Sequence, residues 1–242
     1  MFKHHGKKRN LKHNLKIASL LSFVAGMVNV AGFFSVQTLT TNVTGHFAFF
    51  IDEIFKLDFF TAFICFGYIF FFFLGSFTSS FLMELVVRRR ENIVHLIPAS
   101  IEIAILFSIA AFGDDLIASF PNLISFTLLY AMGMQNSFVT RISNSIVRTT
   151  HLTGLFTDLG IELSQLFFYR EQNKKAELFS SIKLRITIIS FFFIGGIIGG
   201  IFYSRRGLQV LFLGGLVLLG GLIYDNIKLN LILLKRKLKR KQ

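Results

Sequence analysis

Six long runs without charged residues constrain this chain more than any other feature. A helix needs about 20 apolar residues to cross the ~30 Å hydrocarbon core of a membrane. Only 16% of the 242 residues are charged, whereas a soluble domain has about 25%. The third run contains one acid, Glu102, and the six runs are Ile17–Ile51, Phe59–Met83, Ile93–Gly113, Leu116–Thr140, Ile186–Ser204 and Gly207–Tyr224. They predict an all-α, polytopic membrane helix bundle with about six transmembrane helices, and they argue against a soluble enzyme.

The first run is too long for one membrane helix and too short for two. A span over residues 17–36 leaves Gln37–Ile51, which begins with the polar string Gln37–Asn42. Such a segment is typical of a re-entrant or half-spanning helix, because irregular backbone at membrane depth needs protein or a wet cavity beside it. Thr149–Phe168 has the same character. We therefore expect two short re-entrant or broken helices in addition to the spans.

The basic residues predict the orientation of the bundle. The formal net charge of +13 comes from clusters that flank the apolar runs: residues 1–16, Arg88–Arg90, residues 141–185 and the tail 229–242. With six spans these clusters share one side, and the positive-inside rule then places both termini in the cytoplasm. Short juxtamembrane clusters suit anionic lipid headgroups, not a nucleic-acid groove. The lipid bilayer is therefore the expected partner, and nucleic acid is not.

The chain also repeats itself. Gly26–Asn29 recurs as Gly133–Asn136, and Thr40–Phe47 recurs as Thr149–Phe156, in the same order and at similar spacing. Three spans in each half would place the halves in opposite orientations, which is the inverted repeat of many secondary transporters. We predict a basic N-terminus (1–16), repeat half one (17–113), repeat half two (114–228) and a basic tail (229–242).

The residues of the repeated motifs are the candidates for a substrate or ion site. Their hydroxyls and freed backbone groups could line a cavity, whereas small residues four apart could equally serve close helix packing. For His46 a satisfied structural histidine is the alternative. These candidates are Thr41, Thr44, Gly45, His46, Asn136, Thr150, His151, Thr153 and Gly154.

Two acids complete the candidate set. Glu102 lies at the centre of a predicted span, where a charge is costly and is usually functional or paired. Asp158 replaces the Phe49 of the first half, so it breaks the repeat. The alternative for Asp158 is an amphipathic helix that faces the cytosol and balances Arg148 and Arg170.

The glycine pairs of the last two runs predict helix contacts, within the chain or in a homo-oligomer. These pairs are Gly195-Gly196, Gly199-Gly200, Gly214-Gly215 and Gly220-Gly221. The sequence contains no phosphate loop, no H-E-x-x-H motif, no Cys/His cluster and no G-x-S-x-G elbow. We therefore expect no catalytic residue, no cofactor and no metal.

The two motif pairs resemble the YoaK-like family of bacterial multi-spanning inner-membrane proteins, which carry a domain of unknown function. The resemblance extends over about residues 15–228, and the chain differs from the family pattern at Asn29 and His46. It implies the membrane fold and a location in the bacterial cytoplasmic membrane, and it implies no substrate.

Two hypotheses for the function follow. The first is a small-solute secondary transporter or permease-like protein, with its site between the two Thr-Gly segments and with Glu102 or Asp158 as the proton or cation partner. The alternative is a non-transporting scaffold or sensor whose polar motifs serve helix packing. An intramembrane enzyme has the least support, because nothing positions a nucleophile.

Overall fold

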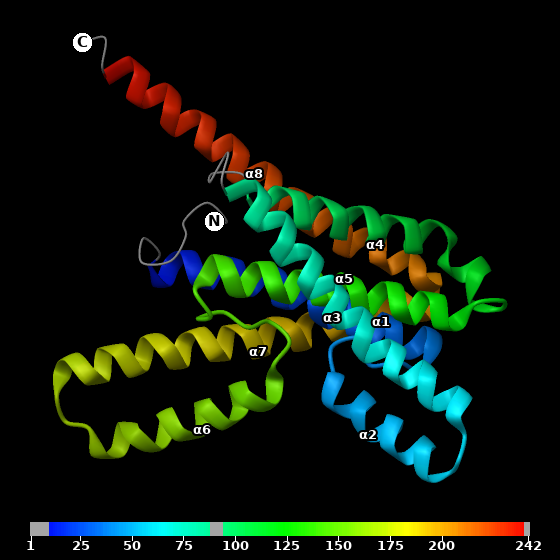
Figure 1. Ribbon diagram of the computed structural model, residues 1–242. Helices are drawn as coiled ribbons and strands as arrows, with labels where there is room; N and C mark the ends of the chain where they lie inside the picture. The colour runs from blue at the N-terminus through cyan, green and yellow to red at the C-terminus, as the bar shows by residue number, and fades with distance from the viewer. Residues whose placement is uncertain (1–9, 88–93, 240–242) are drawn as a thin grey trace.

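The computed structural model describes residues 10–87 and 94–239, with side chains as far as Asp225. All regular secondary structure in these residues is helical (Figure 1). The elements are α1 (Leu11–Val36), α2 (Val43–Phe55), α3 (Phe59–Val87), α4 (Leu96–Ile117), α5 (Pro121–Ser143), α6 (Leu152–Phe168), α7 (Gln172–Arg206), the 3-10 turn η3 (Gly207–Gln209) and α8 (Val210–Lys239).

Helix length separates two short helices from the rest. At 1.5 Å per residue, α2 with 13 residues and α6 with 17 residues are about 20 and 25 Å long, less than the ~30 Å hydrocarbon core. The shortest of the other six, α4, has 22 residues and is about 33 Å long. The two predicted short segments are therefore short helices.

Four stretches are long and apolar enough to cross a membrane, which indicates a membrane protein. They are Leu11–Val36, Phe59–Val87, Leu96–Ile117 and Gln172–Asp225. The last contains both α7 and α8, which are separated at Gly207, where the backbone has a positive φ of 54°. Helix α5 is not among the four stretches.

Several predicted boundaries differ from the structure. Helix α2 begins at Val43 because Gln37 ends α1 in the left-handed conformation and Asn42 caps α2 with its side chain. Helix α4 continues to Ile117, beyond the predicted run that ends at Gly113, so Asp114 and Asp115 lie in its last turn. The predicted run from Leu116 is therefore divided between α4 and α5, and α5 begins at a proline. The Arg88–Arg90 cluster lies outside the described residues.

Helix packing exchanges partners between the two halves of the chain. Helix α1 packs against α7, and α5 packs against α3. The short helices follow the same scheme, with α2 on α3 and α6 on α7; α4 contacts α5, and α8 contacts α1. Helices α1 and α5 therefore form the centre, and they contain fully buried side chains such as Met27 and Phe138.

Two glycines allow the central helices to approach their neighbours closely. A methyl group on Gly26 of α1 would overlap the main-chain carbonyl of Phe192 in α7. A methyl group on Gly133 of α5 would overlap that of Phe72 in α3. Glycine is required at both crossings because main-chain atoms fill the space. The repeated Gly-Met motif thus makes the same kind of contact twice.

The glycine pairs predicted as helix contacts act mainly within the chain. Gly195 and Gly199 meet main-chain atoms of α1, at Phe23 and Met27. Gly221 meets the Leu20 side chain, whereas Gly220 has open space around it. The packing within the chain is one of the two predicted alternatives for these glycines; the homo-oligomer stays a prediction.

The outer surface is apolar. On α3 most of the phenylalanines project outward, and Phe63 is 73% exposed. Figure 1 shows that α1 and α5 run in opposite directions, and that α2 and α6 begin near the centre of the molecule and diverge. The starts of the two short helices therefore come together between the central helices.

Candidate functional site: a central polar cavity

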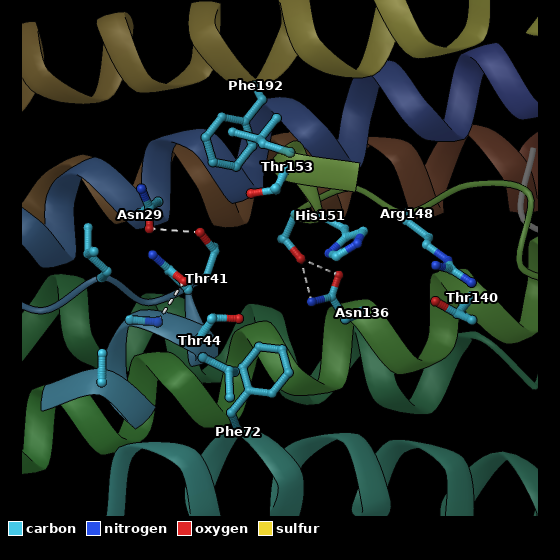
Figure 2. A pocket seen from close by; sticks show the side chains of 17 residues that line it. Asn29, Thr41, Thr44, Phe72, Asn136, Thr140, Arg148, His151, Thr153 and Phe192 are labelled. Carbon is cyan, nitrogen blue, oxygen red and sulfur yellow. Dashed lines mark hydrogen bonds between the residues drawn. The ribbon is translucent and has the colours of Figure 1, made fainter. Parts of the chain in front are cut away.

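A cavity of about 970 Å³ lies where the two short helices begin (Figure 2). Its lining comes from α1 to α3 and from α5 to α7, together with the segments that precede α2 and α6. The lining residues are Asn29, Leu39, Thr41, Asn42, Val43, Thr44, Gly45, Ala48, Phe72, Asn136, Thr140, Arg148, Thr150, His151, Leu152, Thr153 and Phe192. Both copies of the repeated motif thus face one space.

An asparagine–threonine hydrogen bond in each half fixes the irregular segment to the central helix. Thr41 Oγ1 donates to Asn29 Oδ1 at 2.9 Å, and Thr150 Oγ1 donates to Asn136 Oδ1 at 2.8 Å (Figure 2). These bonds hold the residues that precede α2 on α1, and those that precede α6 on α5. The spacing between asparagine and threonine in each motif therefore has a structural cause.

The first turns of α2 and α6 supply the remaining polar groups. Thr44 and Thr153 are exposed, and neither hydroxyl has a hydrogen-bond partner among the described residues. Asn42 caps α2 by accepting from the Gly45 N–H at 3.0 Å, whereas α6 has no side-chain cap. A methyl group on Gly154 would overlap the His151 ring. Gly154 therefore lets the His151 ring lie over the start of α6.

The charge in the cavity comes from one arginine. Arg148 is the sole Lys or Arg among the lining residues, and no Asp or Glu is among them. Within the part of the chain whose side chains are described, Arg148 forms no ion pair and no hydrogen bond. The cavity therefore presents an uncompensated positive charge together with neutral hydroxyl and amide groups.

A second cavity of about 360 Å³ adjoins the first and shares Arg148 and His151 with it. Gly154 and Asp158 line this second cavity and not the first. Asp158 pairs with Arg185 of α7 at 3.0 Å. The ion partner of Asp158 is therefore Arg185, and not Arg148 or Arg170 as the amphipathic alternative supposed.

Glu162 completes the ion cluster between α6 and α7. It accepts hydrogen bonds from Arg185 Nε at 2.8 Å and from Ser181 Oγ at 2.6 Å. Burial opposes ionisation of Glu162, but these hydrogen bonds outweigh burial and lower the pKa of its carboxyl. The cluster fastens α6 to α7, and we name these residues, Asp158, Glu162, Ser181 and Arg185, the α6–α7 clasp.

Two predicted site residues lie outside both cavities. His46 is buried, with Nε2 2.8 Å from the Leu39 carbonyl oxygen and its ring 5.0 Å from the Tyr68 ring centre. Glu102 is fully buried in α4, and neither carboxylate oxygen has a hydrogen-bond partner among the described residues. The structure thus places His46 in a packed, hydrogen-bonded position, and it gives Glu102 no buried partner in that part of the chain.

Sequence reasoning missed several lining residues. Asn29 belongs to the first copy of the repeated motif, at the position that matches Asn136. This match could have identified Asn29 as a lining residue. Phe72 and Phe192 carried no signal among 32 phenylalanines, because only the helix crossings place them at the cavity. In the described residues no group of three or more His, Cys, Asp or Glu is placed to hold a metal ion.

The fold and the site together define a class: an all-helical protein with several apolar, membrane-length helices and a polar cavity at its centre. The particular family is shown by sequence. The chain belongs to the family described as protein of unknown function (DUF1275), which it matches over residues 17–224. Searches of the curated proteins and of the solved structures found no match. The finer resemblance to the YoaK-like proteins stays a prediction.

Proposed function

We propose that this chain is a small-solute secondary transporter or permease-like protein whose substrate occupies the central cavity. The observation that carries the proposal is the lining: matching residues from both halves, Asn29 with Asn136 and Thr41 with Thr150, face one polar space. In many secondary transporters the site lies between two repeats, at the starts of interrupted helices. Here the starts of α2 and α6 supply part of the lining.

The proposed architecture includes an inverted repeat of α1–α4 and α5–α8, and the helix packing supports it. Each helix pair has a counterpart: α1 with α7 corresponds to α5 with α3, and α2 with α3 corresponds to α6 with α7. The close crossing at Gly26 likewise corresponds to the one at Gly133. Opposite helix directions in the two halves (Figure 1) agree with an inverted relation.

The membrane arrangement that fits this repeat has six spans, formed by α1, α3, α4, α5, α7 and α8. Helix α5 is not among the four stretches that are long and apolar enough to cross a membrane, and its polar Asn136 and Gln135 face the protein interior: Asn136 lines the cavity, and Gln135 is fully buried. Polar residues in a span are tolerated where they face a cavity or the bundle interior. In this arrangement the protein lies in a bacterial inner membrane, and both of its termini are in the cytoplasm.

The acids differ in their suitability as coupling groups. Asp158 is paired with Arg185, whereas Glu102 is buried without a hydrogen-bond partner in the described residues. An unpaired acid inside a span is usually functional. We therefore assign the role of proton carrier to Glu102, and we assign Asp158 to the α6–α7 clasp.

Liposome flux with a blocked cavity tests the proposal. Thr153→Trp adds an indole to the cavity lining, and Gly160→Trp adds the same group on α6 where nothing lies within 4 Å. Reconstituted protein should take up at least one solute from a broad panel of radiolabelled metabolites. Uptake should be lost with Thr153→Trp and kept with Gly160→Trp. Native protein that moves no solute in the panel would refute transport.

The scaffold alternative has one observation in its favour. Both asparagine–threonine pairs are satisfied by hydrogen bonds within the chain, as expected of residues that only fix helix positions. If this is their whole role and the protein is only a scaffold, native protein in liposomes will move no solute of the panel, and Thr153→Trp will change only local packing. The flux comparison therefore separates the two functions.

A further inference from the structure

We propose that the central cavity selects small organic anions and that Arg148 is the residue that selects them. This inference rests on the proposed function for the location of the site, and it adds the chemical class of the ligand. Three observations carry it: the charge of the lining, the kind of polar groups that line the cavity together with Arg148, and the two aromatic walls.

The charge of the lining favours an anion. Arg148 brings a permanent positive charge, and no carboxylate lines the cavity to offset it. Asp158 lines the adjoining cavity together with Arg148, but it is already paired with Arg185, and so is Glu162. A cation in this space would meet an uncompensated guanidinium, whereas an anion would supply the missing partner.

The other polar groups suit a carboxylate or a similar oxyanion. Thr44 and Thr153 offer hydroxyl donors from the first turns of α2 and α6. The start of α6 has no side-chain cap, so its first backbone N–H groups are not satisfied by a capping side chain. Helix starts carry partial positive charge, and here two of them open into a cavity that also contains Arg148. Hydroxyl donors, helix starts and guanidinium therefore all favour the same sign of ligand charge.

The size and the walls of the cavity favour an organic ligand. A volume of about 970 Å³ is at the upper end of the ~300–1,000 Å³ typical of small-molecule sites, far more than an inorganic ion fills. Phe72 and Phe192 contribute to the lining from α3 and α7 (Figure 2). An anion with an apolar part would contact these rings while its charged group faces Arg148.

Charged thiol reagents test the selectivity before any substrate is known. In a Cys65→Ala background, Thr44→Cys places a thiol in the lining, since Cys65 is the one native cysteine. The probes are the 2-sulfonatoethyl and 2-(trimethylammonio)ethyl methanethiosulfonates, similar in size and opposite in charge. Each labelling rate, measured by mass spectrometry, is divided by the rate of the same reagent with free cysteine.

The anionic reagent should react at least about tenfold faster than the cationic one on this normalised scale, as expected for one charge-assisted contact. Arg148→Gln should lower this preference by about tenfold, while Arg148→Lys should keep most of it. Arg205→Gln removes a cation that does not line the cavity and should change nothing. If Arg148→Gln does not fold, two results still test anion selection. The protein with Arg148 must prefer the anionic reagent, and Arg148→Lys must keep that preference.

Protection by a ligand tests the organic class. Millimolar benzoate should slow labelling of the cysteine at position 44, and benzamide and inorganic phosphate should not. Equal normalised rates for the two reagents would overturn anion selection while leaving an open cavity and transport intact. No labelling by either reagent would overturn both the open cavity and the selection. Equal protection by phosphate would overturn the organic part.

Discussion

Replacing Gly26 with alanine puts a methyl group where the main chain of α7 already lies. The added carbon would overlap the carbonyl of Phe192 and lie 3.0 Å from the Gly196 nitrogen. All of these are main-chain atoms, so no change of side-chain rotamer can relieve the contact, and α1 and α7 must move apart. Overpacking of a core costs about 1–3 kcal/mol, and a main-chain obstacle places this case near 3 kcal/mol.

Helix propensity partly offsets that cost. Alanine is favoured over glycine inside a helix by about 1 kcal/mol. The net expectation for Gly26→Ala is therefore a loss of about 2 kcal/mol in the free energy of unfolding. Gly220→Ala is the matched control: it is also a helical glycine, but none of the described residues lies within 4 Å of the added methyl group, so the stability of this variant should rise or stay unchanged.

Reversible unfolding in mixed micelles, followed by circular dichroism during titration with SDS, measures both variants. Gly133→Ala should resemble Gly26→Ala, because its methyl group would meet the Phe72 main chain in the corresponding crossing. A Gly26→Ala variant as stable as the native protein would refute the proposed close approach of α1 and α7. A loss of similar size in Gly220→Ala would show that the effect is not specific to the crossing.

Three further predictions concern the polar residues. The α6–α7 clasp contributes its full stability above the ordinary glutamate pKa of 4.5, and this stability is lost as the pH falls through the lowered pKa of Glu162. The protection factor of the α6 amides, which is the exchange rate of an unstructured peptide divided by the measured rate at the same pH, should therefore fall only below about pH 4.5, and Arg185→Gln should lower it at pH 7. A lower protection factor at pH 5 than at pH 7 in the native protein would contradict this. Glu102→Leu removes two buried oxygens that have no partner in the described part of the chain, so it should raise the free energy of unfolding by about 1–3 kcal/mol. It should also abolish proton-coupled uptake, because Glu102 is the proposed proton carrier. A destabilised variant would mean that the carboxyl has a partner. Asn136→Ala leaves Thr150 without its hydrogen-bond partner and should lower the free energy of unfolding by about 1 kcal/mol, with faster exchange in residues 149–151; unchanged exchange there would show that the bond does not hold the segment.

Some residues of the site could be predicted from the sequence and others could not, and this difference has one physical cause. Thr41, Thr44, Thr150 and Thr153 could be named from sequence because a repeated motif identifies residues without reference to distant partners. His46 belonged to the same motif but points elsewhere, since its ring reaches the Leu39 carbonyl and Tyr68. A motif therefore indicates which segment matters, and side-chain direction within it depends on the neighbouring helices.

The sequence by itself determined roughly where most of the helices lie and which segments are short and polar, because hydropathy and helix length are local properties of the chain. It also marked Gly26 and Gly133 through the repeat. Only the tertiary structure decided that α1 packs on α7 and α5 on α3, and this exchange brings Phe72, Phe192 and Arg148 to one cavity. It likewise paired Asp158 with Arg185 and placed Glu102 away from the lining. Contacts of this kind join residues far apart in the chain, so they depend on how helices cross and not on any pattern along the sequence.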